Sequence, residues 1–139
     1  MKIAFIFPGQ GSQYVGMAKE FIENFKESKE VFDIASAALG IDLPQLCMHG
    51  PSETLNRTEN TQPAILAASI AILRPLERRG LSSEAAAGHS LGEYTAITAA
   101  GGFELKDAIT LVQKRGRYMQ EAMPEGAGLM AAILGMDRT

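Results

Sequence analysis

A five-residue segment with the pattern Gly-x-Ser-x-Gly, residues 88–92, constrains the fold of this chain more than any other feature. It follows a short apolar run, residues 84–87, and leads into a helix-like segment that begins at Glu93. Small residues flank the serine because the chain turns sharply from strand to helix, where a Cβ on either side would obstruct the turn. The pattern therefore predicts a strand, a tight turn and a helix, with Ser90 at the turn.

Ser90 is a candidate nucleophile. A serine at the start of a helix lies beside free backbone N–H groups and the positive end of the helix dipole, which favour the negative charge of a tetrahedral intermediate. A purely structural turn between a strand and a helix has the same short pattern. Taken alone, the five residues leave both interpretations open.

The order of the predicted elements indicates an α/β fold with parallel strands, in which the turn at Ser90 lies at the carboxyl end of a strand. Residues 41–61 are expected to be irregular, with a short helical turn. Pro63 is expected in the first turn of a helix, and Pro75 is expected to kink or break that helix. From the spacing of apolar residues we expect strands over 2–7 and 84–87, and helices over 17–25, 31–39, 63–79, 93–100 and 105–122.

The composition, with 46% hydrophobic and 21% charged residues in 139, is typical of one soluble globular domain. No apolar run approaches the length of about 20 residues that spans a bilayer, and no cleavage site follows the apolar start, so we expect a cytoplasmic protein without a membrane segment. A net charge of −3 argues against non-specific binding to nucleic acid. Cys47 is the only cysteine, which excludes an intrachain disulfide and a cysteine-rich metal site, and we expect no metal.

The glycine-rich loop at residues 9–13 follows the first predicted strand. It does not match a dinucleotide site, because Tyr14 stands where a third glycine is needed, and no Gly-Lys-Ser/Thr follows for a phosphate loop. Gln10 could instead donate to an oxyanion if the loop lies beside the turn at Ser90, as loops at the strand ends of one parallel sheet often do. A glutamine that only stabilises the loop is the alternative.

Arg115 lies on the apolar face of the helix predicted over 105–122, whereas Arg117 is rotated away from that face. A guanidinium directed inward needs an anion, because an unpaired buried charge costs several kcal/mol. The anion could be a carboxylate of the protein, in a structural ion pair, or the carboxylate of a substrate held by two hydrogen bonds.

Only two histidines are available to act as a base for Ser90. His89 precedes the serine directly, so the two side chains point apart, and we expect it to support the turn through hydrogen bonds. His49 lies in the segment predicted to be irregular and reads more simply as a loop histidine. The sequence therefore offers a nucleophile without an evident base.

Four motifs together resemble the malonyl-CoA:acyl carrier protein transacylase family over essentially the whole chain. They are Phe-Pro-Gly-Gln-Gly-Ser-Gln at 7–13, Thr-Gln-Pro-Ala at 61–64, Gly-His-Ser-Leu-Gly-Glu-Tyr at 88–94, and Arg-Gly at 115–116. The resemblance implies a hydrolase-like acyltransferase fold with a parallel sheet. It also implies a two-step transfer, in fatty acid biosynthesis, from malonyl-CoA to the pantetheine thiol of acyl carrier protein, with no cofactor on this chain.

The resemblance assigns roles to single residues. Ser90 would take the malonyl group, Gln10 and the backbone N–H of Leu91 would form the oxyanion hole, and Arg115 would bind the malonyl carboxylate. His89 and Gln62 would have supporting roles.

Members of this family carry a catalytic histidine roughly a hundred residues beyond the serine, after a ferredoxin-like subdomain, and this chain ends before both. We therefore expect residues 1–125 to be the N-terminal part of the large subdomain, and residues 126–139 to begin the small one, with its first strand over 129–134. The chain would be an incomplete fragment, truncated or completed by a second chain, and inactive or weak alone. Two alternatives are a serine hydrolase or esterase, which gives no reason for an inward Arg115, and a non-catalytic fragment that binds carrier protein.

Overall fold

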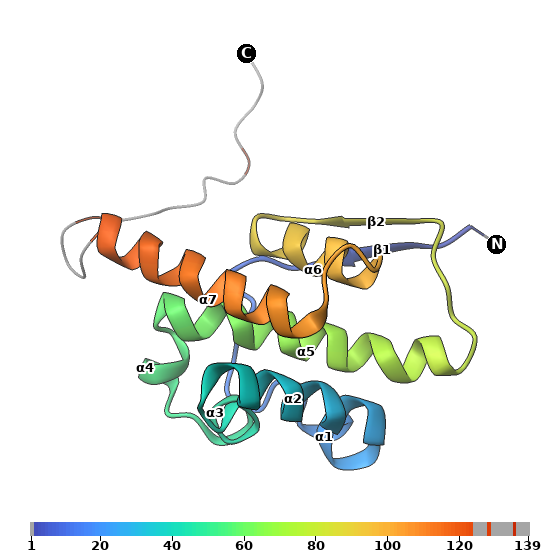
Figure 1. Cartoon of the computed structure of the whole chain (residues 1–139), viewed down its shortest axis with the longest axis horizontal. Coiled ribbons are helices and arrows are strands. Elements are labelled where there is room, and N and C mark those ends of the chain that lie inside the picture. The colour runs from blue at the N-terminus through green and yellow to red at the C-terminus, as the bar shows by residue number, and fades with distance from the viewer. Residues whose placement is uncertain (1, 124–127, 129–134, 136–139) are drawn as a thin grey trace.

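The structure, a computed structural model, describes residues 2–123, Gly128 and Gly135. In that part of the chain, helices pack beside a small parallel sheet, which confirms the expected α/β class (Figure 1). The helix predicted over 105–122 has the same bounds as the last helix described, α7 (Leu105–Ala122). The elements follow in the order β1 (Ala4–Phe7), α1 (Lys19–Asn24), α2 (Lys26–Leu39), α3 (Leu43–His49), α4 (Ser52–Leu55), α5 (Thr58–Arg78), β2 (Ala85–Gly88), α6 (Leu91–Ala99) and α7 (Leu105–Ala122).

The two strands β1 and β2 run parallel and in register, from Ala4 opposite Ala85 to Phe7 opposite Gly88. Because their carboxyl ends meet at one edge, the loop after β1 and the turn after β2 must lie next to each other. A backbone hydrogen bond of 3.2 Å from the His89 N–H to the Phe7 carbonyl joins the two. The sheet thus brings together two segments that are about eighty residues apart in the sequence.

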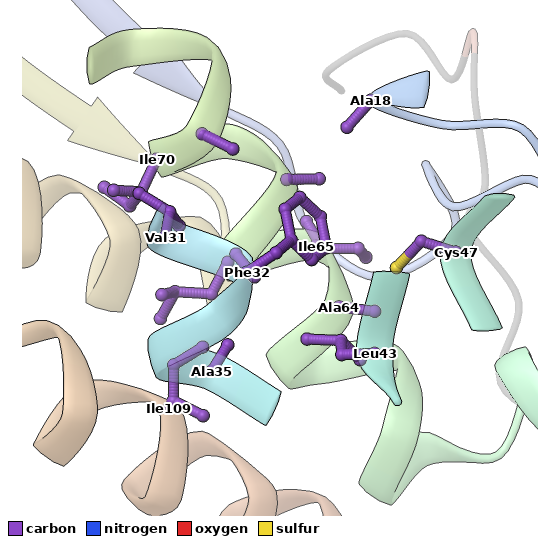
Figure 2. Packing of buried hydrophobic residues seen from close by; sticks show 14 of the residues in the cluster. Ala18, Val31, Phe32, Ala35, Leu43, Cys47, Ala64, Ile65, Ile70 and Ile109 are labelled. Atoms are coloured by element: carbon purple, nitrogen blue, oxygen red, sulfur yellow. The ribbon is translucent and has the colours of Figure 1, made fainter. Parts of the chain in front are cut away.

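The core lies where α2, α5 and α7 contact one another, and α6 packs between α5 and the strands. In Figure 1 the strands and α6 lie on one side of α5 and α7, and α1, α2 and α3 lie on the other. Figure 2 shows Phe32 of α2, Ile70 of α5 and Ile109 of α7 within the core, and all three are fully buried. Burying each such side chain stabilises the fold by roughly 1.5–3 kcal/mol, so this contact sets the position of α7 relative to α5.

Residues 41–61 are more helical than predicted. They contain α3 and α4, and α5 already begins at Thr58. Asp42 starts α3 as its N-cap, since its Oδ1 accepts a hydrogen bond of 2.9 Å from the Gln45 N–H. Pro63 is therefore five residues inside α5, and the prediction that it occupies the first turn is wrong.

Pro75, where a kink or a break was expected, does not break α5, which continues to Arg78. Proline removes the N–H that would bond the carbonyl four residues earlier, which is that of Ala71. The buried Ser28 hydroxyl of α2 donates a hydrogen bond of 2.6 Å to this carbonyl. A contact between helices thus replaces the missing bond within the helix.

The strand expected over residues 129–134, and with it the small subdomain expected over 126–139, lies outside the described residues. Within the described residues, no single helix has the length and hydropathy needed to cross a membrane; the pair α2 and α3, bent by 114°, meets the criterion only when the two are taken together. The same residues contain no group of three or more His, Cys, Asp or Glu side chains placed to hold a metal ion.

Candidate active site

Ser90 lies at the turn between β2 and α6, where it is the N-cap of the helix, with φ 53° and ψ −107°. A positive φ is unusual for a residue other than glycine and is common where a functional side chain is held in a strained turn. Gly88 and Gly92 permit the turn, because a Cβ on Gly88 would collide with the Gly92 backbone and one on Gly92 with the Phe7 carbonyl. The side chain of Ser90 is exposed.

The glycine-rich loop after β1 lies against this turn, as the parallel strands require. A Cβ on Gly9 would stand 2.7 Å from the His89 carbonyl oxygen and 2.8 Å from Nδ1 of its ring. The loop is stabilised by its own side chains, since the Ser12 hydroxyl donates to the Gly9 carbonyl (2.9 Å) and the Gly11 N–H donates to Oε1 of Gln13 (2.8 Å). Gln13, rather than Gln10, therefore makes the hydrogen bond within the loop.

Arg115 projects from α7 to the turn. Its Nη2 donates to Oγ of Ser90 at 3.1 Å, and its Nη1 donates to Oε1 of Gln62 at 2.8 Å. The guanidinium carbon lies 5.4 Å from the centre of the Tyr94 ring, within the range of a cation–π contact. Among the described residues no carboxylate pairs with Arg115, whereas the neighbouring Arg117 pairs with Glu59 at 3.1 Å. Of the two partners expected for Arg115, the described residues thus do not provide the carboxylate of a structural ion pair.

Gln62 is fully buried on α5 and contacts three segments of the chain. Its Oε1 accepts from Arg115, and its Nε2 donates to Oε1 of Gln10 at 3.4 Å and to Sδ of Met119 at 3.1 Å. Gln10 in turn donates from Nε2 to Oγ1 of Thr58 at 3.3 Å. A continuous series of hydrogen bonds therefore runs from Ser90 through Arg115 and Gln62 to Gln10.

Leu91, the first residue of α6, is buried, and its N–H donates to no acceptor within the described residues. The next two amides are engaged in the turn, since Gly92 donates to the His89 carbonyl (2.9 Å) and Glu93 to the Ser90 carbonyl (3.2 Å). An N–H group next to the serine thus remains available at the positive end of a helix.

Neither histidine contacts the Ser90 hydroxyl in the part of the chain that the structure describes. His89 holds the turn through its backbone N–H and carbonyl, and its ring lies against Gly9. His49 is the exposed last residue of α3. The described residues therefore bring together the expected Ser90, Gln10, Leu91, Gln62 and Arg115, but place no base at the serine.

Three neighbours of the site were not foreseen from the sequence: Thr58, Tyr94 and Met119. Each lies four positions along a helix from a residue that was singled out, namely Gln62, Ser90 and Arg115 respectively. Residues at this spacing share one face of a helix. The spacing was thus a usable signal for finding them.

Comparison with known proteins points to the same family that the four sequence motifs resemble. Residues 4–136 match the family described as the acyl transferase domain. The chain is 52% identical over 136 residues to the malonyl CoA-acyl carrier protein transacylase of Bacillus subtilis (strain 168), a match that covers 98% of this chain and 43% of that protein.

Two solved structures are similar in fold and in sequence. The malonyl CoA-acyl carrier protein transacylase of Clostridium perfringens superposes with a TM-score of 0.86 at 52% identity, covering 91% of this chain and 40% of that one. A malonyl-transacylase solved in complex with a type II PKS acyl-carrier protein superposes with a TM-score of 0.87 at 49% identity, covering 91% and 41%. The chain thus spans less than half the length of the relatives that it matches.

Proposed function

Because this chain belongs to the acyl transferase domain family, we propose that it carries the acyl-accepting part of a malonyl-transferring site. The observation that carries the proposal is the contact of 3.1 Å between Nη2 of Arg115 and Oγ of Ser90. It places a cation at the candidate nucleophile, and no carboxylate among the described residues pairs with that cation. A malonyl group has the two features that this pair would recognise, a thioester carbonyl for the serine and a carboxylate for the arginine.

The proposed reaction has two steps. In the first, Oγ of Ser90 forms a bond to the thioester carbon of malonyl-CoA, the carbon–sulfur bond breaks, and coenzyme A leaves as a thiol with the proton of the serine. In the second, the pantetheine thiol of acyl carrier protein attacks the malonyl ester, the carbon–oxygen bond breaks, and a proton returns to Ser90. The chain needs no cofactor of its own, because the partner carries the pantetheine.

Gln10 and the backbone N–H of Leu91 are the proposed donors to the oxyanion of each tetrahedral intermediate. Two observations support this assignment: the Leu91 N–H has no acceptor among the described residues, and the loop that carries Gln10 lies against the turn at Ser90. Loss of one such donor typically lowers the rate by about 10²- to 10³-fold. The neighbouring helix dipole of α6 has the sign that stabilises the same charge.

Arg115 is proposed to bind the malonyl carboxylate. Its planar guanidinium presents several N–H donors in a fixed geometry that fits a carboxylate. Tyr94 and Gln62 hold the guanidinium beside Ser90, and Gln62 is neutral, so neither neighbour competes as an anion. His89 would support the turn, and we place the base that activates Ser90 outside these 139 residues. We further propose that the protein acts in the cytoplasm, where malonyl-CoA and carrier protein would meet it.

The proposal is tested by mixing the 139-residue chain with malonyl-CoA, recording the intact mass over hours, and then adding holo acyl carrier protein. We expect a malonyl adduct that is absent in Ser90→Ala and that passes to the carrier. Release of free malonate without transfer would instead indicate a hydrolase. If no adduct forms while carrier protein still binds, the chain is a non-catalytic binding fragment and the proposal fails.

A further inference from the structure

Gln62 connects the two sides of the candidate site. It lies on α5, between Arg115 of α7 and Gln10 of the loop after β1, and it is fully buried. Bulk solvent does not reach it at that position, so each end of its amide should match the protein atom that it faces. The orientation of this amide is therefore determined by its neighbours.

The guanidinium of Arg115 determines which way the Gln62 amide points. Arginine only donates hydrogen bonds, so the group 2.8 Å from its Nη1 must be the oxygen of Gln62. The Nε2 end then faces the opposite side, where it donates to Oε1 of Gln10 and to the sulfur of Met119. A reversed amide would place N–H against N–H at Arg115 and oxygen against oxygen at Gln10, and both contacts would be repulsive.

The orientation of the Gln10 amide follows from the same argument. Its Oε1 is held towards Gln62 as an acceptor, so its Nε2 points away, where one hydrogen is donated to Oγ1 of Thr58 at 3.3 Å. An amide nitrogen has two hydrogens, and the second finds no acceptor within the described residues. Gln10 therefore presents a donor, not an acceptor, on the side away from Gln62.

We propose that Gln62 is a positioning residue that transmits the donor-only character of Arg115 to Gln10, so that Gln10 offers an N–H to the oxygen of the acyl carbonyl. This inference rests on the proposed function, since only there does the N–H have an oxyanion to stabilise. It also explains why a buried polar side chain stands between the carboxylate-binding arginine and the oxyanion loop. A hydrophobic residue of similar size would fill the same space but leave the Gln10 amide free to turn.

The decisive variant is Gln62→Glu, which keeps the shape and replaces the donor by a second acceptor. One carboxylate oxygen stays on Arg115, and the other draws the Nε2 of Gln10, which turns the Gln10 oxygen towards the reacting carbonyl. With acetyl-CoA, whose acyl group has no carboxylate for Arg115, we expect acylation of Ser90 to slow by about 100-fold, the effect of losing an oxyanion donor. Gln62→Met, which cannot donate and accepts only weakly through its sulfur, should give an intermediate loss.

A double-mutant cycle with Gln10→Ala separates positioning from a structural role. If Gln62 acts through Gln10, Gln62→Glu should change the acylation rate by less than about 3-fold once Gln10 is already alanine. The same factor in both backgrounds would overturn the inference. Far-UV circular dichroism checks that the variants fold. If Gln62→Glu does not fold, the cycle is measured with Gln62→Met in its place.

A second measurement does not depend on any reaction. By NMR, the side-chain amide protons of Gln62 should exchange with solvent far more slowly than those of the exposed Gln45, and Arg115→Met should accelerate the Gln62 exchange at least 10-fold. Unchanged exchange in Arg115→Met would overturn the inference, whatever the chain does with acyl-CoA. A further outcome is that the wild-type chain shows no acylation while Arg115→Met still accelerates exchange of the Gln62 amide protons. That result would refute the proposed function but not the orientation of the two amides.

Discussion

Arg115 illustrates how much one side chain depends on its surroundings. Its position on the apolar face of a helix predicts that it points inward, and a structural ion pair would be the ordinary result. In the structure its partners are a neutral amide, a hydroxyl and an aromatic ring, contributed by Gln62, Ser90 and Tyr94. This set holds the guanidinium in place without neutralising it, which leaves its charge available to a ligand.

Replacing Arg115 by alanine should therefore act selectively. We expect transfer of malonyl to Ser90 to fall by about 10- to 100-fold, the equivalent of roughly 1.5–3 kcal/mol for hydrogen bonds to a charged group. Acetyl transfer should fall less than malonyl transfer, because the acetyl group has no carboxylate and loses only the effect of Arg115 on the Gln62 and Gln10 amides. Arg117→Ala is the matched control, since that arginine is paired with Glu59 and its side chain is 55% exposed. Equal losses for the two acyl groups would exclude the proposed role of Arg115.

Cys47 gives a prediction about pH. It lies on α3 and is fully buried against the core (Figure 2), and burial raises the pKa of its thiol from 9.0 to about 12. Because the folded pKa lies above the unfolded one, the stabilisation is complete below pH 9 and is lost as the pH rises from 9 towards 12.

The free energy of unfolding should therefore fall by up to about 1.4 kcal/mol per pH unit above pH 9 through this group alone. Urea titrations of the wild type and of Cys47→Ala at pH 8, 9 and 10 measure it, and the variant should show the shallower decline. Parallel declines in the two proteins would mean that the thiolate forms without opening the fold.

At the scale of elements, the close approach of α5 and α7 positions the site. Gly116 follows Arg115 on α7, and a Cβ there would stand 2.6 Å from the Thr58 carbonyl oxygen and 2.8 Å from Cα of Glu59. The two helices therefore meet backbone to backbone beside the residues that hold Gln10 and Gln62. This contact explains why Arg-Gly occurs as a pair: the glycine lets the helices approach, and the arginine then reaches the turn at Ser90.

Gly116→Ala tests this contact. Helix propensity alone would make alanine more favourable by about 1 kcal/mol, whereas the collision with backbone atoms should destabilise the protein by about 1–3 kcal/mol net. We expect a lower midpoint of thermal unfolding and slower acylation of Ser90, because α7 carries Arg115. Lys114→Ala, at an exposed position of the same helix, serves as the control and should change stability by less than about 0.5 kcal/mol. A stabilised Gly116→Ala would show that the helices can separate without cost.

For the whole molecule, the sheet is the least covered part of the described chain. It has two strands, each paired on one edge only, and the Ile6 side chain is 73% exposed opposite Ala87, which is exposed too. Hollows of about 600 and 340 Å³ lie along the strands, and neither is lined by Ser90, Gln10 or Arg115. Free strand edges with apolar side chains favour association between chains.

A charge at this surface should reduce self-association. We expect Ile6→Lys to lower the weight-average mass of concentrated solutions, measured by sedimentation velocity, with little change in the free energy of unfolding. Ile34→Lys is the control, since Ile34 is 44% exposed on α2, away from the sheet. A similar decrease in both variants would point to a general effect of charge.

Much of the local structure follows from the sequence. The strand, turn and helix around Ser90, the end of α2 at Leu39, and the bounds of α7 were all foreseen. The errors lie where tertiary contacts compensate for a local signal: α5 is not broken at Pro75, and the Ser28 hydroxyl of a different helix bonds the carbonyl that proline leaves free. Residues 41–61, rich in turn formers, still form α3 and α4 against the core.

The separate parts of the site can be predicted from local sequence, since a Gly-x-Ser-x-Gly turn and the inward face of an amphipathic helix depend on residues within a few positions of one another. How these parts meet depends on the packing of the whole chain. Arg115 reaches Gln62 across 53 positions and Ser90 across 25, and Gln62 reaches Gln10 across 52. Such distances are closed by the packing of α5 against α7 and by the parallel register of β1 and β2, so the polarity of the amides at the serine is a property of the fold and not of any one motif.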